Sequence, residues 1–204
     1  MPTRRTVLGL LAAAPAGSAY AAANGGADLV AAARRQIGVT KGYDHLYHKI
    51  AYPWGDLPRS TGVCADVVVR AARDAWRVDL QQLVHEDMAR DFAAYPQRWR
   101  LPGPDSNIDH RRVPNLETYW MRHGAQLWRA NGPTWGGGFP GPLLPGDILT
   151  WRSFVGGGPH VALVSQGGPI PRLIQNAGWG VHEEFIISQW LAGANGHYRW
   201  RPRA

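Results

Sequence analysis

One segment limits what this chain can fold into. Residues 60–77 (STGVCADVVVRAARDAWR) form an apolar run that carries charges only at Asp66, Arg70, Arg73, Asp74 and Arg77. The pattern, entered through Gly62, predicts a largely buried helix that ends near Arg77. The only cysteine of the protein, Cys64, then stands in the first turn of that helix.

The position of Cys64 suggests a chemical role. The first turn of a helix has unpaired N–H groups and the positive end of the helix dipole, and both favour a thiolate and lower the pKa of the thiol. We therefore interpret Cys64 as the nucleophile of a hydrolase. The alternative is an inert cysteine, because free cysteines are among the most frequently buried residues.

The order of the predicted elements indicates an α+β fold. Amphipathic patterns predict helices at 27–37, 80–92 and 115–123, the last capped by Asn115 and stopped by Gly124, and a short helix at 183–191. Short apolar segments bounded by glycine and proline predict strands at 147–151, 160–166, 172–176 and 197–200. Loops are expected at 39–61, 96–114 and 132–145. Helices followed by an antiparallel sheet define the α+β class.

The N-terminus has the features of an export signal. Arg4 and Arg5 form a twin-arginine pattern before a short apolar region, and Ala19-Tyr20-Ala21 fits a cleavage site. An ordinary secretory signal with two chance arginines is the alternative, and both predict a periplasmic or extracellular protein. Cleavage after Ala21 leaves a single domain, 22–204, and no later stretch is long and apolar enough to span a bilayer.

Neither a disulfide within the chain nor a cysteine-rich zinc site can form with one cysteine. The segment 85–87 (HED) lacks the second histidine of a zincin site. The segment from Asp105 resembles a calcium loop, but His110 and Leu116 stand where glycine and glutamate are needed. We expect no metal and no cofactor.

The chain is basic, with a net charge of +7 that falls to +5 once residues 1–21 are removed. The arginines are scattered and no nucleic-acid motif is present, so we expect no nucleic-acid partner. Outside the cell the common polyanions are the cell wall and its attached polymers, and a basic surface would hold an enzyme near them. Charge that serves only solubility is the alternative. We expect a monomer.

The second half of the chain offers Cys64 a base. If residues 160–166 and 172–176 pair as a hairpin around Gly168, His160 and Asn176 lie directly opposite each other on one face. The histidine would take the thiol proton, and the amide would fix the orientation and tautomer of the ring. The alternative is a structural histidine and a turn asparagine, and a slip of one residue would separate the pair.

These motifs carry a resemblance. Residues 52–58 (YPWGDLP), Cys64, 145–151 (PGDILTW) and 160–164 (HVALV) are similar to the signature of the NlpC-type, papain-like cell-wall cysteine peptidases. Over nearly the whole mature chain, the sequence more closely resembles the bacterial domain-of-unknown-function family 1287, through 63–68 (VCADVV), 83–88 (LVHEDM), 104–115 (PDSNIDHRRVPN) and 196–199 (GHYR). The resemblance implies a cysteine-bearing helix packed on a small antiparallel sheet that carries the histidine. It also implies hydrolysis of amide bonds in peptidoglycan stem peptides.

The resemblance implies roles for further residues, and at some positions this chain differs from the pattern of the peptidases. Carried over by position, Tyr52 would point its hydroxyl into the site, and the backbone N–H of Cys64 would help to bind the oxyanion. The broader peptidases usually have an acid before the cysteine and Ser-Gly after it, where this chain has Val63 and Ala65-Asp66, and we expect Asp66 to be structural.

Two groups near the expected cleft have open roles. Asp109 and His110 either brace the wall of the site or contact substrate, and bracing is favoured because long ordered loops need internal hydrogen bonds. Tryptophans near the rim either stack on sugar rings or pack in the core: Trp54, Trp135, Trp151 and Trp179.

Three functional hypotheses follow from these residues. The first is a peptidoglycan endopeptidase or amidase that uses Cys64, His160 and Asn176. The second is an acyltransferase or thioesterase on the same fold. The third is a non-catalytic wall-binding protein.

Overall fold

The computed structural model describes residues 16–130, 141–153, 157–168, 170–186 and 193–202, with side chains from residue 25 onward. Residues 1–15 of the expected signal 1–21, Trp135 and most of the expected loop 132–145 lie outside these ranges, and residues 16–21 belong to the first helix. Within them, no helix combines the length and the apolar character needed to cross a membrane.

The helices come first along the chain. They are α1 (Ala16–Arg34), α2 (Cys64–Trp76), α3 (Leu80–Arg90) and α4 (Val113–Arg122), with single 3₁₀ turns η1 (Phe92–Ala94) and η2 (Asp109–Arg111) between α3 and α4. Two short parallel strands, β1 (Gly42–Tyr43) and β2 (Thr61–Gly62), pair just before α2. The predicted Cys64 helix is therefore confirmed, and Arg77 ends it in the left-handed conformation.

A six-stranded antiparallel sheet follows, in the order β3-β8-β4-β5-β6-β7. Its strands are β3 (Gln126–Arg129), β4 (Ile148–Trp151), β5 (His160–Gln166), β6 (Arg172–Asn176), β7 (Val181–Phe185) and β8 (Gly196–Tyr198). The mixed α+β class and the four predicted strands are confirmed. The sequence reasoning missed β3, which is short and mostly exposed.

Two predictions about helices are wrong. Residues 183–185 belong to strand β7 because Glu183 pairs with Ile174 of β6, and sheet pairing overrides the local preference of this short segment. Residues 187–191 of the same expected helix lie outside the described ranges. Asn115 does not cap α4, because Pro114 allows the helix to begin earlier, after Arg112, and Asn115 is fully buried within the first turn.

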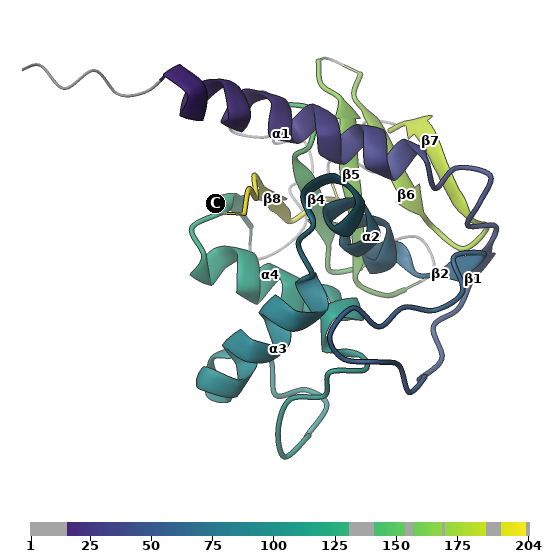
Figure 1. The fold of residues 1–204 in the computed structure, drawn as a ribbon, viewed down its shortest axis with the longest axis vertical. Helices are drawn as coiled ribbons and strands as arrows, with labels where there is room; N and C mark the ends of the chain where they lie inside the picture. Colours follow the sequence, from purple (N-terminus) through teal and green to yellow (C-terminus); the bar gives the residue numbers. More distant parts are fainter. Residues whose placement is uncertain (1–15, 131–140, 154–156, 169, 187–192, 203–204) are drawn as a thin grey trace, which may run out of the picture.

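Helices α1 and α2 cover one face of the sheet (Figure 1). α1 packs beside α2, and both contact β5 and β6. Val161 and Leu163 point toward these helices and share a core with Cys64. Ala162 and Val164 alternate to the other face, where a second, smaller cluster forms. The Cys64 helix thus lies directly on the strand that begins with His160.

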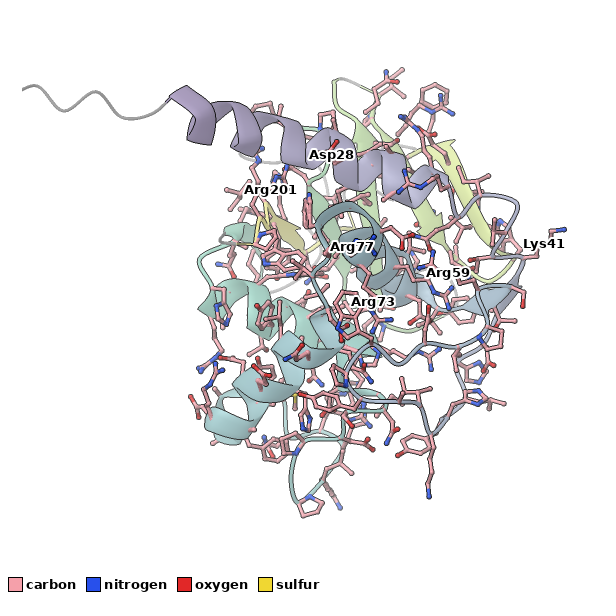
Figure 2. The ribbon with its side chains drawn as sticks, viewed as in Figure 1. Asp28, Lys41, Arg59, Arg73, Arg77 and Arg201 are labelled. Atoms are coloured by element: carbon pink, nitrogen blue, oxygen red, sulfur yellow. The ribbon has the colours of Figure 1, made fainter. Side chains whose placement is uncertain are left out.

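Buried charges lock the elements together. Arg73 of α2, which Figure 2 labels, bonds Asp79, the N-cap of α3, at 2.6 Å. Asp147 accepts the backbone N–H of Leu144 in the turn before β4, and it also bonds His197 and Arg199. These contacts hold α3 against α2 and hold the C-terminal strand against the centre of the sheet.

Candidate active site around Cys64

The start of α2 sets the position of Cys64. Val63 is the extended N-cap residue, and its N–H donates to the carboxylate of Asp66 at 2.7 Å. This is half of a capping box, and it confirms the structural role expected for Asp66. Cys64 is the first helical residue, is 3% exposed, and lines a cavity of about 420 Å³.

The thiol does not have the lowered pKa that the helix dipole predicted. Burial is the largest influence and raises the pKa of Cys64, whereas the N–H of Val161 and the hydroxyl of Tyr43 lower it by less. The desolvation of a charged sulfur therefore outweighs the helix terminus. In this structure Cys64 is a protonated thiol at neutral pH, and a base must remove its proton before it can act as a nucleophile.

This pKa leads to a first prediction. The rate of Cys64 alkylation by iodoacetamide is expected to keep rising above the usual thiol pKa of about 8.5, because thiolate forms only at higher pH. The rate would be followed by mass spectrometry over a pH series, with the urea-unfolded protein as the reference. A folded protein whose rate levels off below pH 7 would show a stabilised thiolate and contradict this prediction.

Tyr43, and not Tyr52, is the tyrosine at the thiol. The hydroxyl of Tyr43 lies 4.0 Å from Sγ of Cys64, because Tyr43 pairs with Gly62 across the β1–β2 ribbon. Burial, and after it Cys64, raises the pKa of Tyr43, so its hydroxyl remains a proton donor. Tyr52 is 42% exposed and packs edge-on against His85, with 4.9 Å between the ring centroids. The prediction for Tyr52 is therefore wrong.

The register of β5 and β6 differs by one residue from the predicted hairpin. Gln166 pairs with Arg172 next to the turn, and a bulge at Ser165 then shifts the pairing by one residue, so that Leu163 pairs with Ile174. A register shift of one residue moves each side chain to the opposite face of the sheet. Gln175 therefore shares the face of His160, and Asn176 lies on the other face. Nε2 of His160 is 2.7 Å from Oε1 of Gln175. Gln175 therefore takes the position assigned to Asn176.

Asn176 has a supporting function. Its Nδ2 donates to the carbonyl oxygens of Gly42 at 3.1 Å and Gly62 at 3.0 Å. Its Oδ1 accepts the N–H groups of Gly178 and Gly180. The side chain is fully buried, and it fixes the β1–β2 ribbon that carries Tyr43 to the end of the sheet.

The partners of Gln175 determine the tautomer of His160. Nε2 of Gln175 donates to the carboxylate of Glu184, which also bonds His182. A carboxylate only accepts, so the amide oxygen of Gln175 must face His160, and Nε2 of the imidazole must carry the proton. Burial lowers the pKa of His160 to about 4. The ring is therefore neutral, and its Nδ1 carries the lone pair of a base.

The structure brings Cys64 to the beginning of β5. Sγ lies against the backbone N–H of Val161, the residue after His160. The ring of His160 is on the other face, 5.7 Å from that of Trp151. Besides the N–H of Val161, the hydroxyl of Tyr43 is a hydrogen-bond partner of the thiol.

The segment 104–115 braces the cavity. Arg111 bonds both carboxylate oxygens of Asp66, at 3.2 and 3.3 Å, and so joins this segment to the Cys64 helix. Asp109 is 1% exposed and accepts bonds from Asp105, Arg112 and Asn115.

His110 is buried as well. Burial, followed by the nearby Arg73 and Arg111, lowers the pKa of His110 to about 3, so it is a neutral internal residue. The contacts of Asp109 and His110 favour the bracing interpretation.

The tryptophans have separate environments. Trp151 is buried in the sheet, and Trp54 lies under the guanidinium of Arg73. Trp179 is 66% exposed and stacks on His182, with 5.5 Å between the ring centroids. None of these three lines the Cys64 cavity. The tryptophan that does so is Trp99, which the sequence reasoning did not single out.

The cavity contains further residues that sequence reasoning missed. Tyr43, His45 and Trp99 carry no motif signal, because the chain brings them together from separate loops. Arg111 and Arg112 were quoted in a motif without a role. Within the described residues, no group of histidine, cysteine and acidic side chains is arranged to hold a metal ion.

Comparison with known proteins confirms the resemblance to the domain-of-unknown-function family 1287. The family model described as "Domain of unknown function (DUF1287)" matches residues 30–200. The chain belongs to the DUF1287 family. It is 47% identical over 171 residues to "Uncharacterized protein YijF" of Escherichia coli (strain K12), which covers 82% of this chain and 78% of that protein. No solved structure matches this DUF1287 chain.

Proposed function

We propose that this DUF1287 protein is an exported cysteine hydrolase that cleaves amide bonds in peptidoglycan stem peptides, as an endopeptidase or amidase. The proposal includes an NlpC-type, papain-like core and a periplasmic or extracellular location. The observation that supports it most is the placement of Cys64. The only cysteine is the first residue of a helix, it borders a cavity of about 420 Å³, and it touches the strand that begins with a tautomer-fixed histidine.

The proposed reaction uses residues of this chain alone. Nδ1 of His160 takes the thiol proton, and the sulfur attacks the substrate carbonyl carbon. The N–H of Cys64 and the hydroxyl of Tyr43 donate to the oxyanion. The imidazolium then protonates the leaving amine as the C–N bond breaks. Water attacks the thioester with His160 again as base, which releases the acid and restores the thiol.

Gln175 has a testable role in this scheme. Gln175→Ala is expected to lower kcat on the order of 10²-fold, because the imidazole loses the acceptor that fixes its tautomer. The pH dependence of kcat should shift as well. Asn176→Ala is the matched comparison, since it removes the neighbouring amide from the other face. It should lower the melting temperature and leave the pH dependence of kcat unchanged, and the reverse pattern would refute the assignment of Gln175.

The function itself is tested by digestion of purified sacculi. The mature protein should release stem-peptide fragments whose masses identify the bond, and protein alkylated at Cys64 should release none. An acyltransferase or thioesterase is the alternative, and the apolar side chains of the cavity favour it: Val63, Trp99, Ile108, Val113, Pro114 and Pro159. Intact sacculi together with turnover of an acyl thioester would establish that alternative. Equal binding of sacculi by native and alkylated protein, without turnover, would indicate a wall-binding protein.

A further inference from the structure

The Cys64 cavity has an uneven distribution of charge. Its described lining includes Arg111, Arg112 and His45, but no carboxylate. The carboxylates that pair with the two arginines are Asp66 and Asp109, which are 4% and 1% exposed and do not line this cavity. The basic groups therefore border the space in which a ligand would lie, and their acidic partners are enclosed in the protein.

The two arginines differ in how many of their N–H donors are already used in hydrogen bonds within the protein. Arg111 donates through Nε, Nη1 and Nη2 to Asp66 and to two backbone carbonyl oxygens. Arg112 donates through Nη1 to Asp109 at 2.9 Å, and this is the one hydrogen bond of its guanidinium among the described residues. A guanidinium has five N–H groups in a rigid plane. Arg112 thus keeps donors for another acceptor, whereas Arg111 is committed to the protein.

Arg112 is also held in place. Its guanidinium lies 4.2 Å from the ring centroid of Trp99, which is a cation–π distance, and its side chain is 16% exposed. The stacking and the bond to Asp109 fix the plane of the group before a ligand arrives. A fixed and partly desolvated guanidinium binds a carboxylate with less loss of entropy and less screening than a mobile surface arginine.

We propose that Arg112 is a carboxylate-recognition residue, which selects substrates that carry a carboxylate close to the carbonyl attacked by Cys64. This inference rests on the proposed function, because it names the substrate class of the same site. The apolar wall beside Arg112, formed by Ile108, Val113 and Pro114, would accept the aliphatic part of the same substrate unit. The ligand class is an acidic peptide or another aliphatic carboxylate.

Alkylation of Cys64 tests the inference without requiring hydrolysis. The full chain is treated with iodoacetate or 3-iodopropionate and, separately, with the corresponding neutral amide. The rate at which Cys64 is alkylated by the carboxylate reagent is then divided by the rate for its amide. The modified residue is unambiguous because Cys64 is the only cysteine. Arg112→Gln is expected to lower this ratio about tenfold, the usual effect of losing a charge-assisted hydrogen bond.

Arg77→Gln is the matched control. It removes the same charge from an exposed residue at the other end of α2 (Figure 2), about 20 Å from Cys64 at 1.5 Å per residue. This variant should keep the wild-type ratio. An equal fall of the ratio in both variants would show that the overall electrostatic field of the protein causes the preference, and it would overturn the proposal. An unchanged ratio in Arg112→Gln would overturn it as well.

Two further readouts complete the test. Arg112→Lys keeps the charge and should give a ratio between those of the wild type and Arg112→Gln. If circular dichroism shows that Arg112→Gln is unfolded, a lower ratio in Arg112→Lys than in the wild type supports the proposal, and an unchanged ratio overturns it. A folded wild type that neither reagent modifies would also overturn the proposal, since the cavity would not lead to the thiol. Sacculus digestion measures the hydrolase activity separately, so the activity and the carboxylate preference can fail independently.

Discussion

Replacing Cys64 with alanine is expected to abolish the release of peptide fragments from sacculi, with a fall in rate of at least about 10³-fold. No other thiol is present to replace it. The change removes one sulfur atom from a buried position, so the cost in stability should be about 1 kcal/mol or less. Fragment release would be measured by mass spectrometry, and the melting temperature would show that the variant folds.

The controls for this prediction separate the two histidines near the cysteine. His160→Ala should lose activity as fully as Cys64→Ala, because the thiol is protonated and requires a base. His45 lines the same cavity but has no part in the Gln175–Glu184 chain, so His45→Ala should retain most of the activity. If His45→Ala is inactive and His160→Ala is active, the base has been assigned to the wrong histidine. A fully active Cys64→Ala would refute the cysteine mechanism.

The sequence was sufficient for the parts of the site that depend on local pattern. The apolar run after Gly62 predicted α2 and placed Cys64 at its first turn, and glycine and proline boundaries predicted β4, β5, β6 and β8. These features depend on neighbouring residues, whose periodicity and turn preferences can be read directly.

The errors arose where the outcome depends on distant contacts. A bulge at Ser165 changed the face of every residue beyond it, and so exchanged Asn176 for Gln175. The pKa of Cys64 is set by how completely the fold encloses it, which its position at a helix terminus does not reveal. Tyr43 reaches the thiol through a two-residue ribbon that has no hydrophobic period. Motif position alone therefore selected the wrong tyrosine and the wrong amide.

Breaking the ion pair between Arg111 and Asp66 is expected to destabilise the fold strongly. Arg111→Met is expected to lower the free energy of unfolding by about 3–5 kcal/mol, because it leaves a buried carboxylate without its charged partner. The side chains of the pair are only 5% and 6% exposed. Arg111 also holds the carbonyl oxygens of Asp44 and Leu46, so the loop that carries Tyr43 and His45 should loosen. Urea denaturation monitored by tryptophan fluorescence would measure the loss.

Arg59→Met provides the matched comparison, since it breaks an ion pair with Asp74 that is 46% and 23% exposed. An exposed pair contributes about 1 kcal/mol or less, so this variant should remain close to the wild type. In the double variant Arg111→Met/Asp66→Asn, the uncompensated charge is removed, and the loss should be smaller than the sum of the two single losses. Additive losses would mean that the two side chains act independently. In that case the segment 104–115 would not owe its place beside Cys64 to this ion pair.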